Sequence, residues 1–321
     1  MRPLTLPPNV LRHFYAGGER IAALRGTPPA DHSPEEWIGA ANTTFDGSRG
    51  LSRLPDGRLV RDALDADPEG FLGPSHVARY GSDPALLVKL LDAGQRLPVH
   101  FHPDREFAAR TLGLGHGKTE AWLIVEASAG ASVWVGFSRS VALEEVRGWM
   151  AAQDSAAMLA VMHELPVRAG DAIFVPAGTP HAIGEGILMV EVQEPTDLSV
   201  LLEWEGFELT EDEGHLGLGW DVALEALDRS GWSPEQVAAL RGPGAGRSLL
   251  PAAAAPFFRA EPVRGGDSLD AGYSIVVGLE GAGELGDVEL ARGTALLVPH
   301  AAGPLTVSGD VSGIRCRPPA P

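Results

Sequence analysis

The stretch that decides the fold is Val99-His100-Phe101-His102-Pro103-Asp104. Side chains alternate between the two faces of a β-strand, so an extended segment places His100 and His102 on the same face. Two later segments supply further candidate ligands: Gly117-Lys118-Thr119-Glu120 and Pro176-Ala177-Gly178-Thr179-Pro180-His181. Two imidazoles on one face, joined by a carboxylate and a third imidazole from elsewhere in the chain, predict a site for a divalent transition metal.

The composition excludes several classes of partner. The formal net charge of -18 argues against nucleic acid and against anionic membranes. The lone cysteine, Cys316, excludes an internal disulfide and a cysteine-rich metal site. The chain begins without the apolar run of a secretory signal, and no apolar stretch approaches the roughly 18 residues of a transmembrane helix. We therefore expect a cytoplasmic protein that acts on a small molecule; the sequence leaves its oligomeric state open.

The 40 glycines and 26 prolines favour short strands and frequent turns over long helices. Helical patterns occur at residues 59–72, 103–112, 143–165 (in two pieces), 221–227 and 234–240, and strand patterns at 84–92, 120–125, 132–136, 172–176, 187–193 and 198–204. We expect a metal-binding domain over residues 1–240, a linker over 241–256, and a smaller β-domain without metal ligands over 257–321.

Two charged residues lie inside apolar strand patterns. Lys89 interrupts the run at 84–92, and burying an ammonium without a partner is expensive. It either extends to an edge of the sheet or points into a polar pocket. Glu191 shares a strand face with Gln193. It is a candidate general base, or a carboxylate that hydrogen-bonds the backbone or orients a metal-binding histidine.

Two sets of residues around these segments combine possible metal ligands with glycines and a proline that favour turns. The first set is Gly94, His100, His102, Glu106 and Gly113, and the second is Gly170, Pro176, Gly178 and His181. Their order and spacing resemble the two signature motifs of the cupin superfamily. Cupins are small double-sheet β-barrels of the jelly-roll type, so the resemblance implies a mainly β chain with a metal-bearing barrel, short helical insertions and a second, smaller β-domain.

A narrower resemblance covers roughly residues 30–220. The segments 87–92, 99–104, 117–122, 175–183 and 191–193 resemble, in the same order, motifs of the type I mannose-6-phosphate isomerases. The resemblance implies one zinc ion per chain, with His100, His102, Glu120 and His181 as ligands. His100 stands where that family usually has glutamine, and imidazole is at least as good a zinc ligand. The same ligands also accept iron, manganese, cobalt or nickel.

The third type of ligand has two candidates. The general cupin pattern nominates Glu106, and the isomerase pattern nominates Glu120. Glu106 is already explained as an acid in the first turn of a helix, where it suits the helix dipole. We therefore favour Glu120.

The resemblance further implies an aldose–ketose isomerase that interconverts mannose 6-phosphate and fructose 6-phosphate through an enediolate. Lys118 and Glu191 are then the candidate catalytic residues, and Lys89 and Lys118 the candidate substrate-binding residues. The expected partner is a small sugar or sugar phosphate.

Two positions depart from the family pattern at the phosphate end of the substrate. Pro98 replaces a serine and Leu201 replaces an arginine, whose bidentate fork suits a phosphate. Arg96 and Arg139 are candidate substitutes. The departures keep two alternatives open: an isomerase of a different or unphosphorylated sugar, and a non-catalytic cupin that binds a sugar or a metal.

Overall fold

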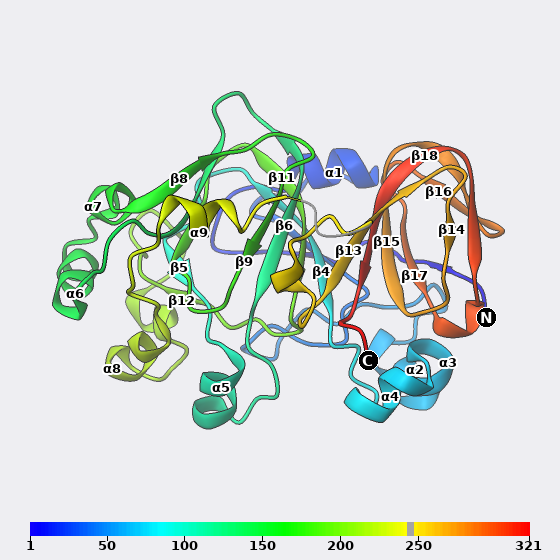
Figure 1. The fold of residues 1–321 in the computed structure, drawn as a ribbon, viewed down its shortest axis with the longest axis horizontal. Helices are drawn as coiled ribbons and strands as arrows, with labels where there is room; N and C mark the ends of the chain where they lie inside the picture. The colour runs from blue at the N-terminus through cyan, green and yellow to red at the C-terminus, as the bar shows by residue number, and fades with distance from the viewer. Residues whose placement is uncertain (243–246) are drawn as a thin grey trace.

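The computed structural model describes residues 1–242 and 247–321, and it is mainly β (Figure 1). The strands of a five-stranded sheet are, in spatial order, β12 (Val200–Leu201), β5 (His100–Phe101), β10 (His181–Ile183), β7 (Ser132–Phe137) and β8 (Met162–Pro166). Those of a six-stranded sheet are β2 (Val10–Leu11), β3 (Glu35–Ile38), β4 (Leu87–Ala93), β11 (Ile187–Gln193), β6 (Glu120–Ala127) and β9 (Ala172–Val175). The prediction of a mainly β, cupin-like fold with short helical insertions is confirmed.

These two sheets face each other. In an antiparallel pair, directly opposite residues point to the same face. His181 lies opposite His100 in the five-stranded sheet, and Gln193 lies opposite Glu120 in the six-stranded sheet. His102, which follows β5, approaches Glu120 Oε2 to 3.0 Å through its Nε2. The candidate metal ligands therefore meet between the two sheets.

A seven-stranded sheet occupies the C-terminal part of the chain, in orange and red in Figure 1. Its strands are β1 (Leu4–Thr5), β17 (Ala295–Val298), β15 (Ser274–Leu285), β18 (Leu305–Arg317) and β13 (Arg259–Arg264), with β14 (Ser268–Leu269) on β18 and β16 (Val288–Ala291) on β15. Because β1 pairs with β17, the beginning of the chain completes a sheet that is otherwise built from its end.

Strand β4 is buried on both faces, which explains its nearly continuous apolar sequence. Val88 and Leu90 belong to the same core as Ile275 and Cys316 of the C-terminal sheet. The alternate residues of β4 point the other way, toward the five-stranded sheet. Lys89 is one of them, so a lysine in this run faces the ligand-bearing side rather than the core.

The helices are short. They are α1 (Glu19–Arg25), α2 (Val60–Ala66), α3 (Pro68–Leu72), α4 (Pro74–Tyr80), α5 (Arg105–Phe107), α6 (Leu143–Ala152), α7 (Ser155–Ala160), α8 (Trp220–Ala223) and α9 (Pro234–Ala238). A π-helical turn at Ala108–Leu112 continues α5, and 3₁₀ turns lie at Glu211–His215, Leu224–Ala226, Ala252–Ala254 and His300–Ala302. None of the helices in the described parts of the chain combines the length and the apolar character needed to cross a membrane.

The predicted boundaries of two elements, at 143–165 and 198–204, are wrong. The helical pattern at 143–165 stops at Ala160, because Met162–Pro166 forms edge strand β8 against β7. The strand predicted at 198–204 contains only Val200–Leu201, which pair with Phe101 and His100. In both cases pairing with a distant segment decides the boundary, and a local pattern does not contain that information.

The division into domains at 1–240, 241–256 and 257–321 stays a prediction. Residues 243–246 of the expected linker lie outside the described residues. Contacts cross the expected boundary at α3, which packs against the 3₁₀ turn His300–Ala302. At Gly73, which ends α3, a Cβ atom would lie 2.7 Å from the His300 ring, so this close approach requires glycine.

Candidate active site

Three histidines converge between the sheets. His100, His102 and His181 offer ring nitrogens that all lie within 4.8 Å of one another, and all three side chains are buried. His100 and His181 face each other on β5 and β10, with ring centroids 4.0 Å apart. Strand pairing brings together residues that are 81 positions apart in the sequence. This cluster could bind a metal ion.

Backbone carbonyls fix which nitrogen of each ring faces the centre of the cluster. Nδ1 of His100, His102 and His181 lies 2.8 Å from the carbonyl oxygens of Pro98, Leu198 and Thr179, respectively. A carbonyl only accepts hydrogen bonds, so each Nδ1 carries the proton and each Nε2 keeps its lone pair.

The protonation states agree with this arrangement. Burial lowers the pKa of both His102 and His181 to about 3, and burial also holds the pKa of His100 well below its usual value. All three rings are therefore neutral near pH 7. The buried Nε2 of His181 has no hydrogen-bond partner within the described chain. Three neutral Nε2 atoms with fixed tautomers fit a divalent metal.

Glu120 at the start of β6 supplies the carboxylate. Its Oε2 lies 3.0 Å from His102 Nε2 and its Oε1 lies 3.5 Å from His181 Nε2. Burial opposes ionisation of Glu120, but the Lys118 ammonium holds the pKa of this carboxyl group well below its usual range. The ligand set expected from the sequence is thus brought together. Glu106 is exposed on α5 and lies outside the cluster.

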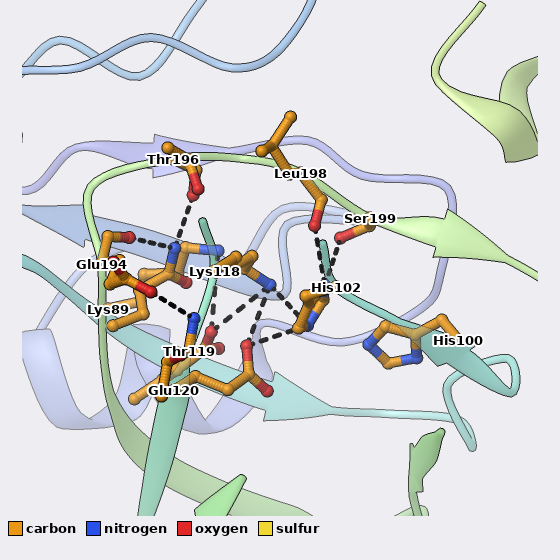
Figure 2. A network of polar contacts seen from close by, with 12 residues as sticks. Lys89, His100, His102, Lys118, Thr119, Glu120, Glu194, Thr196, Leu198 and Ser199 are labelled. Carbon is orange, nitrogen blue, oxygen red and sulfur yellow. Dashed lines mark hydrogen bonds and ion pairs between the residues drawn. The ribbon is translucent and has the colours of Figure 1, made fainter. Parts of the chain in front are cut away.

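Lys118 lies between the carboxylate and a histidine, as Figure 2 shows. Its Nζ forms an ion pair with Glu120 Oε2 at 3.0 Å and donates to His102 Nε2 at 3.0 Å. These are the lone pairs that a metal would use. Lys118 and a metal therefore compete for the same atoms, and metal binding would free the ammonium for other contacts.

A row of alternating charges continues from this point across the six-stranded sheet. Lys118 Nζ is 3.8 Å from Glu191 Oε1, Glu191 Oε1 is 3.9 Å from Lys89 Nζ, and Lys89 Nζ is 3.1 Å from Glu35 Oε2. We call Glu35, Lys89, Glu191, Lys118 and Glu120 the charged row. The strand register accounts for this arrangement. Lys89 lies opposite Glu191, and Glu191 lies opposite Trp122, which shares a face of β6 with Glu120.

The charged row sets unusual protonation equilibria. Burial raises the pKa of Glu191 to about 8, against the opposing effect of Lys89, and Glu191 Oε1 has no hydrogen-bond partner in the described chain. Burial disfavours the charged form of Lys89, but Glu191 and Glu35 more than offset this and raise its pKa. A carboxyl group with a pKa near neutrality is suited to accept and return a proton.

Both lysines of the chain lie in this site. All the other basic side chains apart from histidine are arginines. Lys89 and Lys118 are 2% and 5% exposed. Of the two interpretations of Lys89, the polar pocket is therefore the one that the geometry supports.

A cavity of about 340 Å³ opens onto two of the candidate ligands, His100 and Glu120, and onto the charged row. It is lined by His100, Glu120, Lys118, Glu191, Lys89 and Glu35, and by both positions that depart from the family pattern, Pro98 and Leu201. Arg96 and Arg139 do not line it. They pair instead with Glu203 at 2.7 Å and with Glu145 at 2.5 Å.

The structure adds residues that the sequence analysis missed. Glu35 is buried on β3 and accepts hydrogen bonds from Tyr15 Oη at 2.7 Å and Trp37 Nε1 at 2.8 Å. His13 Nε2 lies 3.3 Å from Glu35 Oε2, and both residues line the cavity. All four residues of strand 35–38 are buried, and a buried acid needs a partner. An acid in such a strand is the signal that could have pointed to Glu35.

No family model matches the chain. A mannose-6-phosphate isomerase of Streptococcus mutans serotype c is 32% identical over 216 residues, which are 66% of this chain and 63% of that protein. A second, ManA of Bacillus subtilis, is 30% identical over 204 residues, which are 62% of this chain and 60% of that protein. This chain is therefore similar to mannose-6-phosphate isomerases over as much as 66% of its length.

The fold comparison extends over the whole chain. The crystal structure of a Bacillus subtilis mannose 6-phosphate isomerase superposes with a TM-score of 0.77 at 20% identity, covering 99% of this chain and 100% of that one. The sequence alignments span less than two thirds of the length of the curated relatives. The likeness to this structure concerns the fold alone.

Proposed function

We propose that this protein is a zinc-dependent aldose–ketose isomerase that interconverts mannose 6-phosphate and fructose 6-phosphate. The observation that carries the proposal is the meeting of two features in one cavity. Three neutral imidazoles and Glu120 fit a metal, and the buried carboxyl group of Glu191 lies beside them. The names of the relatives point to the same substrate pair. We expect the reaction to take place in the cytoplasm.

The reaction moves one proton between two adjacent carbons and another between their oxygens. When bound, zinc supplies a Lewis acid that polarises the carbonyl oxygen of the sugar. Glu191 takes the proton from C2 of the aldose and returns it to C1. Two features suit this exchange: Glu191 Oε1 has no hydrogen-bond partner among the described residues, and the pKa of Glu191 is raised to about 8.

Lys118 stabilises the negative charge that develops on the sugar oxygens in the enediolate. Its ammonium lies near both Glu120 and Glu191, so a substrate oxygen placed between them comes within its reach. Lys89 keeps Glu191 in place from the opposite side, because the two residues face each other across β4 and β11. Lys89 also lines the cavity, where it contacts the sugar.

A second candidate function is the isomerisation of an unphosphorylated sugar. Two observations favour it. Leu201 and Pro98 contribute no donor to the cavity, and both lysines already pair with carboxylates. A non-catalytic cupin would explain a metal site without turnover, but it gives no role to the buried Glu191 beside the cluster.

A coupled assay with zinc-loaded protein separates these functions. Turnover of mannose 6-phosphate but not of mannose supports the first, and the reverse result supports the second. Binding of sugars without turnover of either would support the non-catalytic alternative.

A further inference from the structure

The cations around the cavity differ in whether they are free to meet a ligand. Lys89 and Lys118 are held by the carboxylates of the charged row, and their positions next to Glu191 place them at the reacting carbons. A phosphate group at the other end of a hexose needs a separate cation. Arg49 is the remaining lysine or arginine among the described residues that line the cavity.

Arg49 is available to a ligand. It is exposed, and its Nη1 donates to the backbone carbonyl oxygen of Arg12. Its guanidinium makes no ion pair with a carboxylate among residues 1–242 and 247–321. The other N–H groups of the Arg49 guanidinium can therefore donate hydrogen bonds to an anion.

A short turn, Thr44–Arg49, presents this side chain. Arg49 O accepts from Thr44 N at 2.8 Å, and Asp46 closes the turn by accepting from Thr44 Oγ1 at 2.6 Å and from Ser48 N at 3.0 Å. The next residue, Gly50, has a φ of +110°, and a Cβ there would lie 2.6 Å from the Trp37 ring. The turn is therefore closed by its own hydrogen bonds and packs directly on Trp37 of β3.

This placement puts Arg49 and the metal ligands at opposite ends of the charged row. The Trp37 ring lies on β3 and Glu120 on β6, with β4 and β11 between them. At the usual strand spacing, β3 and β6 are about 14 Å apart. With bonds of about 1.5 Å, an extended hexose 6-phosphate has its phosphorus on the order of 8 Å from the carbonyl carbon. The long arginine side chain covers the remaining distance.

Four acids also line this end of the cavity, but they are occupied or solvated. Asp46 closes the turn, Asp197 Oδ2 accepts from Phe45 N at 3.1 Å, and Glu213 Oε2 accepts from Thr210 N at 2.7 Å. The Asp212 side chain is 99% exposed, so water screens its charge. None of the four pairs with Arg49.

We propose that Arg49 binds the terminal phosphate of the substrate and replaces the arginine that the family pattern expects at Leu201. This inference rests on the proposed function and names the residue that selects a phosphorylated sugar. A guanidinium can form two parallel hydrogen bonds with a phosphate, and neither Pro98 nor Leu201 offers a donor.

The test is binding of a ligand that cannot react. Mannitol 1-phosphate and mannitol differ only in the phosphate, and neither has a carbonyl group. Calorimetric titration of the zinc-loaded wild type should give tighter binding of mannitol 1-phosphate. Arg49→Gln should weaken that binding about tenfold to a hundredfold and leave mannitol unchanged. Arg49→Lys, which keeps the charge but loses the fork, should lie between the two.

Arg12→Gln is the matched control, because Arg12 is a neighbouring arginine that pairs with Glu208 and does not line the cavity. It should bind mannitol 1-phosphate within twofold of the wild type. The inference is overturned if Arg49→Gln binds within twofold of the wild type, or if the wild type does not distinguish the two ligands. Failure of the proposed function is separate: it would be phosphate-dependent binding without isomerisation.

Discussion

Lys89 and Glu191 lie directly opposite each other on β4 and β11, with Lys89 Nζ 3.9 Å from Glu191 Oε1. Both side chains are almost fully buried, yet both line the cavity that His100 and Glu120 also line. A buried pair at this distance compensates charge without a direct hydrogen bond. It leaves the carboxyl group able to exchange a proton, and this relationship connects the fold with the proposed chemistry.

The first prediction concerns the pH dependence of turnover. Glu191 must be ionised to accept a proton, so kcat/KM should rise with pH as this carboxyl group ionises. The midpoint should lie at or below pH 8, because the pKa is raised to about 8 and a bound cation favours the carboxylate. Glu191→Gln should lower kcat about a hundredfold or more while the bound zinc stays the same. A rate that does not change between pH 5 and pH 9 would contradict this role.

The same group makes the stability of the metal-free protein depend on pH. The folded state holds the Glu191 proton up to about pH 8, whereas the unfolded chain releases it near the ordinary value for glutamate. Between these values the folded state binds more protons, so the contribution of Glu191 to the free energy of unfolding falls as the pH rises. Urea titrations of the wild type and Glu191→Gln should show this fall in the wild type only. Parallel pH profiles would show that the raised pKa is absent.

Removal of a candidate metal ligand should weaken zinc binding. Structural zinc sites supply about 10–16 kcal/mol over four ligands, so removing one should weaken binding by roughly a hundredfold. His181→Ala and His102→Ala should both lose zinc during dialysis, as measured by elemental analysis. His163→Gln is the matched control, because this histidine lies on β8 and bonds the carbonyl oxygen of Trp232 outside the cluster. Retention of zinc by both alanine variants would place the metal elsewhere.

Glu120 and Glu106 can be distinguished in the same way. Glu120→Gln should lower zinc affinity, because Glu120 is the carboxylate that reaches His102 and His181. Glu106→Gln should leave it unchanged, because Glu106 is exposed on α5. The opposite result would favour the general cupin pattern over the isomerase pattern.

A further prediction tests the buried end of the charged row. Glu35 accepts from Tyr15 and Trp37 and pairs with Lys89, so Glu35→Ala leaves a buried ammonium with only a distant partner. We expect the free energy of unfolding to fall by about 3 kcal/mol, measured by urea denaturation. Glu35→Gln combined with Lys89→Met should recover part of this loss, because the unpaired charge is then removed. The exposed Asp31→Ala should have little effect.

The candidate ligands can be named from the sequence because each lies in a segment whose local pattern is informative. His100 begins strand β5 and His102 follows it, His181 follows a Gly-Thr-Pro turn, and Glu120 begins a strand. Only the convergence of these segments requires the tertiary structure. The three-histidine cluster shows that convergence directly.

The sequence does not predict Glu35, His13 or Arg49. Each reaches the cavity through a pairing or packing choice that a local pattern does not contain. Glu35 depends on the register of β3 against β4, and Arg49 depends on a turn that packs on Trp37. The two arginines that the sequence offered as phosphate ligands, Arg96 and Arg139, bind carboxylates away from the cavity. Long side chains can reach several partners, so sequence position alone does not place a guanidinium.

The histidine cluster and Glu191 are proposed to act together in isomerising a sugar phosphate. The most direct measurement is nuclear magnetic resonance of mannose 6-phosphate in D₂O, with metal-free protein, zinc-loaded protein and zinc-loaded Glu191→Gln. We predict that fructose 6-phosphate forms only with the zinc-loaded wild type. A zinc-loaded wild type that produces no ketose from mannose 6-phosphate, or a metal-free protein that produces it equally fast, would contradict the account.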